Sequence, residues 1–175
     1  MSTATWALDD PRVVNGVKTA ILTTSSGVAC ESDSECMLES PPDMNVEGQQ
    51  QINVMYCGGQ CLVYDFCYEA DKWALTYLQS HSLRLFQKSL DMTQVKAIYR
   101  PLIDLKYPRD PSILASIEMR TVTFWDFHSE TTLRPSELDC DVTPAFDIRS
   151  MCIADTGNAC GLTLDVVEVA YDSEY

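Results

Sequence analysis

The 175-residue chain carries 26 Asp and Glu against 12 Lys and Arg, a formal net charge of −14, and 46% of its residues are hydrophobic. This length and composition are typical of one globular domain, so we predict a single acidic domain over residues 1–175. A polyanion is repelled by nucleic-acid backbones and by anionic lipid, and we therefore predict no nucleic-acid partner. No apolar run is long enough to span a bilayer, and the first residues lack the pattern of a secretory signal. We accordingly predict no membrane insertion.

The first third of the chain indicates strands and one long loop. Residues 13–22 are rich in β-branched side chains around Asn15-Gly16, which predicts a hairpin or a bulged strand. Residues 25–48 are rich in Ser, Glu, Asp and Pro and predict a long polar loop. Residues 52–56 and 62–66 then predict two short strands on either side of a Gly-rich turn.

The middle of the chain predicts two helices. Asp71 is a candidate N-cap for a helix over residues 72–90, whose apolar residues recur at helical spacing. Asp91 and Gln94 have the spacing of a capping box for a second helix, which Pro101 should end. We expect a helical hairpin over about residues 72–106.

The last third of the chain again indicates strands. Apolar and polar residues alternate from Ile117 to Phe127, and residues 162–171 are rich in β-branched side chains. Strands at both ends and helices in the middle predict an α+β fold. We expect a mostly antiparallel sheet with the helical hairpin packed on one face.

Eight cysteines are the unusual feature of the composition, and three interpretations remain open. They can be buried free thiols, since cysteine packs as a small apolar residue. They can form disulfides, for which Cys152 and Cys160 are the best local pair because they flank a turn between two strand-like segments. Cys57, Cys61 and Cys67 can instead offer three soft ligands to a metal ion, although their spacing departs from that of structural zinc sites.

Two histidines limit the catalytic chemistry that the chain can carry. His81 lies on the border of the predicted amphipathic helix, where a half-packed, half-solvated side chain is expected. Asp126, His128 and Glu130 alternate on a predicted strand, so they share a face and are a second weak metal candidate, or else a solvated strand edge. The sequence contains no nucleophile elbow and no phosphate-binding Gly-rich loop. We predict neither catalysis nor a cofactor.

Charge is unevenly distributed along the chain: residues 19–71 sum to −9, residues 72–110 to +4 and residues 111–175 to −9. This alternation led us to expect a non-enzymatic structural or assembly subunit of a larger particle such as a virion. Its partners would be other protein subunits, including copies of itself, and salt would weaken the assembly. The alternatives are a secreted, disulfide-stabilised binding domain and a metal-binding protein or metal-dependent enzyme.

Overall fold

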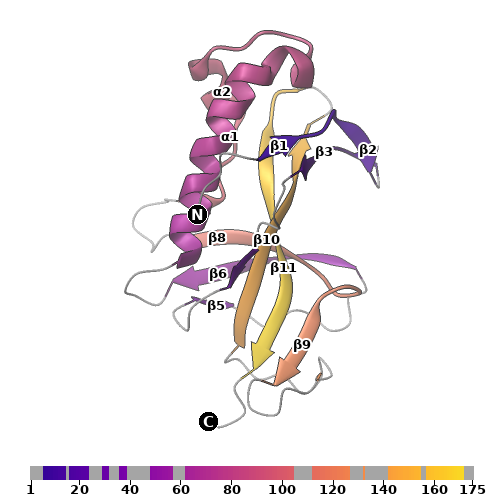
Figure 1. Ribbon diagram of the computed structural model, residues 1–175, viewed down its shortest axis with the longest axis vertical. Coiled ribbons are helices and arrows are strands. Elements are labelled where there is room, and N and C mark those ends of the chain that lie inside the picture. The colour runs from indigo at the N-terminus through magenta and orange to yellow at the C-terminus, as the bar shows by residue number, and fades with distance from the viewer. Residues whose placement is uncertain are drawn as a thin grey trace. The chain divides into compact units, whose positions relative to one another are not determined.

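The computed structural model describes residues 6–14, 16–23, 29–31, 36–38, 48–56, 62–104, 112–126, 132, 142–154 and 157–171. The two helices of these residues are α1 (Leu62–Phe86) and α2 (Met92–Ile98). The strands are β1 (Ala7–Leu8), β2 (Arg12–Val14), β3 (Val17–Thr23), β4 (Ala29–Glu31), β5 (Cys36–Leu38), β6 (Gln49–Tyr56), β7 (Ile103–Asp104), β8 (Ser112–Glu118), β9 (Thr123–Asp126), β10 (Val142–Ile153) and β11 (Cys160–Tyr171) (Figure 1). No helix in the described part of the chain is long and apolar enough to cross a membrane.

The fold is α+β with a mostly antiparallel sheet, as the sequence predicted. Most described strand pairs are antiparallel, and β11 forms parallel pairs with β8 and with β9. The chain groups into two compact units. Unit 1 comprises residues 1–28, 66–102 and 148–163, and unit 2 comprises residues 29–65, 103–147 and 164–175. The expectation of a single domain stays a prediction.

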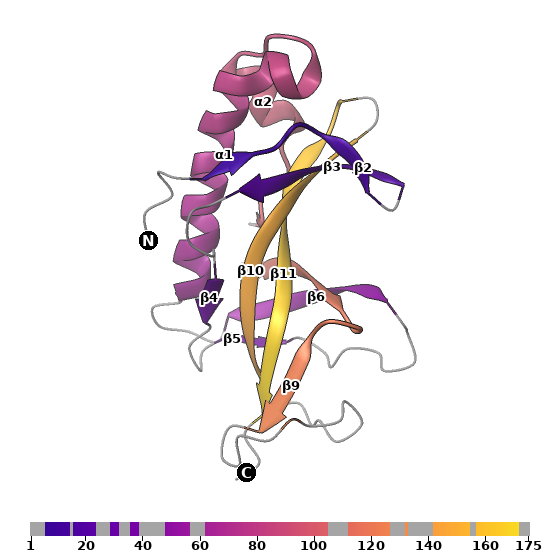
Figure 2. The same cartoon turned by 45° about the vertical axis from the view of Figure 1, so that its right-hand side comes forward.

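Unit 1 contains the predicted N-terminal hairpin. β2 and β3 pair antiparallel with Val14 opposite Val17, and Gly16 between them has a φ of 81°, which glycine adopts without strain (Figure 2). On its other side, β3 pairs with β10. The apolar side chains of this sheet and of α1 form the core of the unit. Its members include Trp6, Leu8, Ala20, Leu22, Ala74, Leu78, Leu85, Met151 and Ile153.

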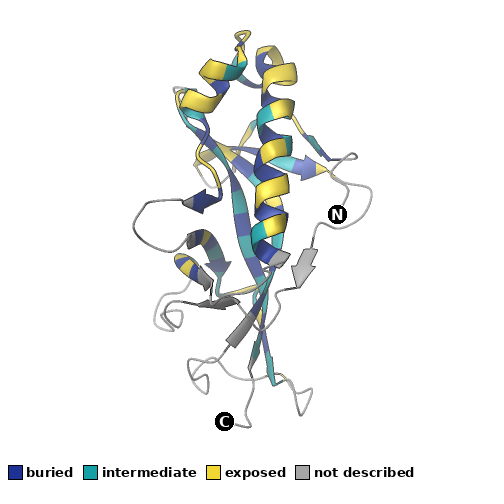
Figure 3. Cartoon of the chain, turned by 90° about the vertical axis from the view of Figure 1, so that its left-hand side faces the viewer, coloured by how far each residue is buried: buried dark blue, intermediate teal, exposed yellow. Residues whose placement is uncertain are grey.

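Helix α1 begins ten residues earlier than the sequence predicted. Residues 62–66 are helical, so the predicted strand there is wrong, and Asp71 lies inside the helix instead of capping it. Val63, Phe66, Cys67 and Ala70 are buried at helical spacing, which indicates that packing overrides the β preference of this aromatic and β-branched stretch. Figure 3 shows buried and exposed residues alternating along the helix.

Helix α2 begins as the sequence predicted. Asp91 accepts a hydrogen bond from the Gln94 backbone at 2.8 Å, and the Gln94 side chain accepts one from the Asp91 backbone at 3.0 Å. The helix ends at Ile98. Pro101 disfavours the helical conformation at the residue before it, so the helix stops close to where the proline predicts. The two helices therefore form the expected pair in the middle of the chain.

Unit 2 is a sheet around β6 and β8, which pair antiparallel from Gln49↔Glu118 to Met55↔Ser112. β5 pairs with β6, and β4 pairs with β10, so the predicted loop over residues 25–48 contains two short strands. These two strands form because they pair with strands distant in sequence, and the polar composition of residues 25–48 does not reveal such pairing. The single alternation predicted from Ile117 to Phe127 is interrupted by a turn, in which Thr121 and Val122 donate to the Glu118 carbonyl.

Candidate functional site

Three rings lie along one face of α1, and we call Trp73, Tyr77 and His81 the aromatic ladder. Residues four apart are neighbours on a helix surface. The Trp73 and Tyr77 ring centroids are 5.0 Å apart, and the Tyr77 and His81 rings stack at 4.0 Å with an interplanar angle of 15°. Trp6 contacts Trp73 edge to face at 5.3 Å. The ladder therefore runs from a half-buried tryptophan, Trp73, at one end to an exposed imidazole, His81, at the other.

The imidazole of His81 is held in one orientation. Its Nδ1 lies 3.0 Å from the Tyr77 carbonyl oxygen. Because a carbonyl only accepts, Nδ1 carries the proton and Nε2 is the acceptor of the neutral ring. One face of the ring stacks on Tyr77 and the residue is exposed, which makes His81 a flat, oriented surface open to solvent.

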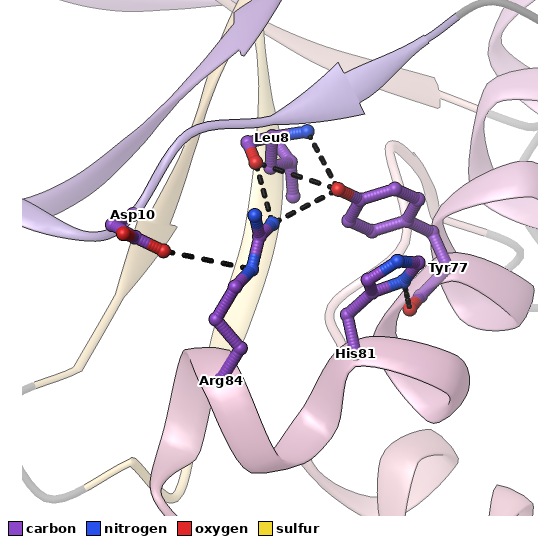
Figure 4. A network of polar contacts seen from close by, with 5 residues as sticks. All are labelled: Leu8, Asp10, Tyr77, His81 and Arg84. Carbon is purple, nitrogen blue, oxygen red and sulfur yellow. Dashed lines mark hydrogen bonds and ion pairs between the residues drawn. The ribbon is translucent and has the colours of Figure 1, made fainter.

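Arg84 lies beside the ladder and is tied to the N-terminal segment (Figure 4). Its Nη2 donates to the Leu8 carbonyl at 2.5 Å and to the Tyr77 hydroxyl at 2.9 Å, and its Nε lies 3.6 Å from an Asp10 carboxylate oxygen. The Tyr77 hydroxyl also accepts from the Leu8 amide at 3.1 Å. Tyr77 thus supports the His81 ring with its own ring and positions the Arg84 guanidinium with its hydroxyl.

The charge of the chain is segregated between the two units. Unit 1 carries eight Lys and Arg against six Asp and Glu, a net of +2, whereas unit 2 carries four against twenty, a net of −16. Within unit 1 the basic side chains of the helical pair are all exposed: Lys72, Arg84, Lys88, Lys96 and Arg100. The acid at the centre of this region, Asp71, is buried. The stretch from Lys72 to Arg100 therefore carries five exposed cations against one exposed acid, Asp91, in an acidic protein.

Asp71 fixes the segment after α2 to the middle of α1. Its carboxylate accepts a 2.5 Å hydrogen bond from the Tyr99 hydroxyl and bonds from the Leu102 amide at 3.1 and 3.0 Å. Burial, followed by the charge of Asp71, raises the pKa of the Tyr99 phenol. The phenol consequently stays a hydrogen-bond donor, and we assign this cluster a structural role.

Cys160 is a buried thiol close to the same cluster. Its carbonyl accepts a 2.8 Å hydrogen bond from the Arg100 amide, and burial raises the pKa of its thiol to about 11. A thiol that keeps its proton is a poor nucleophile and a poor metal ligand.

The raised pKa of Cys160 predicts a loss of stability at alkaline pH. Above pH 9, the ordinary value, the unfolded chain loses this proton while the folded chain keeps it. The free energy of unfolding should fall between about pH 9 and 11, by up to about 3 kcal/mol at 1.36 kcal/mol per pKa unit. In urea denaturation, Cys160→Ala should therefore lower the free energy of unfolding by less at about pH 10.5 than at about pH 8. An equal cost at both pH values would contradict this assignment.

Cys152 and Cys160 are the pair for which the sequence predicts a disulfide. In this structure Cys152 is an exposed free thiol and Cys160 is a buried one, and the disulfide between them stays a prediction. The Ala154 amide donates to the Ala159 carbonyl, so these two residues are partners and Cys152 does not lie directly opposite Cys160. Cys160 is buried and Cys152 is exposed, as for side chains on opposite faces of a sheet. The Cys152 sulfur instead lies 3.4 Å from the Thr163 hydroxyl.

The two metal candidates fall largely outside the described residues. Cys57, Cys61, His128 and Glu130 all lie there, whereas Cys67 is buried in α1 and Asp126 ends β9. Both metal sites stay predictions. Sequence reasoning missed Trp73 and Tyr77 as site residues. The spacing of four residues from Trp73 to Tyr77, and again from Tyr77 to His81, was the signal that could have identified the ladder.

No family model and no curated protein matches this chain. Among solved structures, it is similar to one described as the single-stranded DNA-binding protein from bacteriophage Enc34, C-terminal truncation. The TM-score is 0.47 and the identity is 10%, over 96% of this chain and 94% of that one.

This comparison contradicts two predictions from the sequence, that the chain is a structural or assembly subunit of a particle and that it has no nucleic-acid partner. Both are withdrawn, whereas the two alternatives, a disulfide-stabilised binding domain and a metal-binding protein or metal-dependent enzyme, stay predictions. The prediction of no nucleic-acid partner used the net charge of −14 for the whole chain, which is the sum of +2 for unit 1 and −16 for unit 2 and describes neither unit.

Proposed function

We propose that this protein is a non-enzymatic binder of single-stranded nucleic acid and that the strand binds to unit 1 at the aromatic ladder. A base would stack on the open face of His81, and Arg84 with the other cations of the helical pair would contact phosphates. The observation that carries the proposal is the exposed imidazole, stacked at 4.0 Å on Tyr77 beside a guanidinium.

Stacking on a preformed platform favours single strands over duplexes. Every unpaired base offers a π-face, whereas a duplex hides its base faces between neighbouring pairs. The His81 ring is already oriented by its hydrogen bond to the Tyr77 carbonyl, so little conformational freedom is lost when a base stacks on it. Such a platform does not read base edges, and we expect little sequence preference.

The exposed cations of the helical pair supply the second requirement, which is attraction to the phosphate backbone. Five basic side chains lie between Lys72 and Arg100, and the exposed acids in this stretch are Glu69, just before it, and Asp91. Binding that neutralises phosphates releases counterions and therefore weakens as salt rises. A strand that stacks on His81 should show this dependence.

Fluorescence anisotropy with a labelled oligothymidylate of about 16 nucleotides tests the proposal. We expect saturable binding that weakens steadily between about 50 and about 200 mM salt, and weaker binding of a duplex of the same length. The absence of binding at the lowest salt, or tighter binding of the duplex, would overturn it.

A further inference from the structure

The edge of the unit 1 sheet carries a β-bulge at residues 9–11. β1 and β2 both pair with β3, but the register is Leu8↔Leu22 before the break and Arg12↔Thr19 after it. Three residues on one strand therefore oppose two on the other. A bulge redirects side chains and recurs beside functional sites. Here it brings Asp10 to the Arg84 guanidinium (Figure 4).

Asp10 is the weakest of the groups that hold Arg84. The Leu8 carbonyl and the Tyr77 hydroxyl fix one end of the guanidinium at hydrogen-bond distance, whereas the Asp10 carboxylate lies 3.6 Å from Nε. The side chains of Arg84 and Asp10 are 42% and 80% exposed. An ion pair this exposed is easily displaced by another anion, while the two stronger contacts keep the guanidinium in place.

We propose that Asp10 is an intramolecular competitor that occupies the phosphate-binding edge of Arg84 until a nucleic-acid phosphate displaces it. This inference rests on the proposed function and adds a residue that sets the affinity of the same site. A carboxylate and a phosphate both accept hydrogen bonds from the guanidinium fork, so they compete for the same N–H groups. Asp10 therefore lowers the affinity of the site for any anionic strand.

Asp10→Asn is the test, and Asp9→Asn is its matched control. Both substitutions remove one negative charge from adjacent exposed residues, and only Asp10 contacts Arg84. At low salt, Asp10→Asn should bind the oligothymidylate about two- to fivefold more tightly than Asp9→Asn, the range expected for an exposed ion pair. Its binding should also depend more steeply on salt. The slope of the logarithm of the binding constant against the logarithm of the salt concentration should steepen by up to about 0.7, because Arg84 then pairs with a phosphate without first giving up its pair with a carboxylate.

The possible outcomes distinguish the inference from the function on which it rests. A gain for Asp10→Asn that disappears in an Arg84→Gln background supports the competition. Equal affinities of the two Asn variants, with binding by the wild-type protein, would overturn the competition and leave the proposed function standing. If the wild-type protein binds no single strand, both the competition by Asp10 and the proposed function are wrong.

Discussion

Replacing Asp71 with alanine is expected to lower the free energy of unfolding by about 2–4 kcal/mol. The substitution leaves the buried Tyr99 hydroxyl and the Leu102 amide without the acceptor that both use. Tyr99→Phe should cost less, about 1 kcal/mol, because Asp71 would still accept from Leu102. Urea denaturation followed by tryptophan fluorescence measures both effects.

Glu69→Ala is the matched control for Asp71→Ala. Glu69 is an acid on the same helix, but it is exposed and its 3.5 Å ion pair with Lys72 is exposed as well. Its removal should change stability by less than about 0.5 kcal/mol. If Asp71→Ala cost no more than Glu69→Ala, the Asp71 cluster would not fasten α1 to the segment after α2 as we argue.

Replacing His81 with alanine is expected to weaken binding of a single strand by about 5- to 150-fold, since stacking of one base on an aromatic ring is worth about 1–3 kcal/mol. His81→Phe should retain most of the affinity, because a phenyl ring also stacks. This pair of variants separates stacking from any role of the imidazole nitrogens. Anisotropy at fixed low salt measures the affinities, and circular dichroism reports whether each variant is folded.

Gln79→Ala serves as the control for the His81 variants. Gln79 is an exposed residue of the same helix that belongs neither to the ladder nor to the Arg84 contacts. Its replacement should leave binding within about twofold, as is usual for a substitution away from the contact surface. Equal affinities of His81→Ala and the wild-type protein would mean that the strand does not stack on the ladder.

Features governed by neighbours in sequence were predictable. The capping box of Asp91 and Gln94 and the turn at Gly16 depend on residues within three positions of each other, and both appear where the sequence placed them. The start of α1 was not predictable, because residues 62–66 have the composition of a strand and only the burial of Val63 and Phe66 at helical spacing favours a helix.

The candidate site depended on contacts that no local pattern contains. Asp71 looked like a helix cap, yet its partners Tyr99 and Leu102 lie 28 and 31 residues away in sequence. Arg84 reaches Leu8, 76 residues away. The spacing of four between the rings of the aromatic ladder is present in the sequence, but the net charge of the whole chain argued against the nucleic-acid partner that we propose for it.

The measurement that tests the central claim most directly is ultraviolet crosslinking of a bromouracil-substituted single strand to the intact protein, followed by trypsin digestion and mass spectrometry. Trypsin cleaves after Lys72 and Arg84, so Trp73, Tyr77 and His81 fall in one peptide over residues 73–84. Binding at the aromatic ladder predicts that this peptide carries the crosslinked nucleotide. Crosslinks confined to peptides of unit 2 would contradict the account.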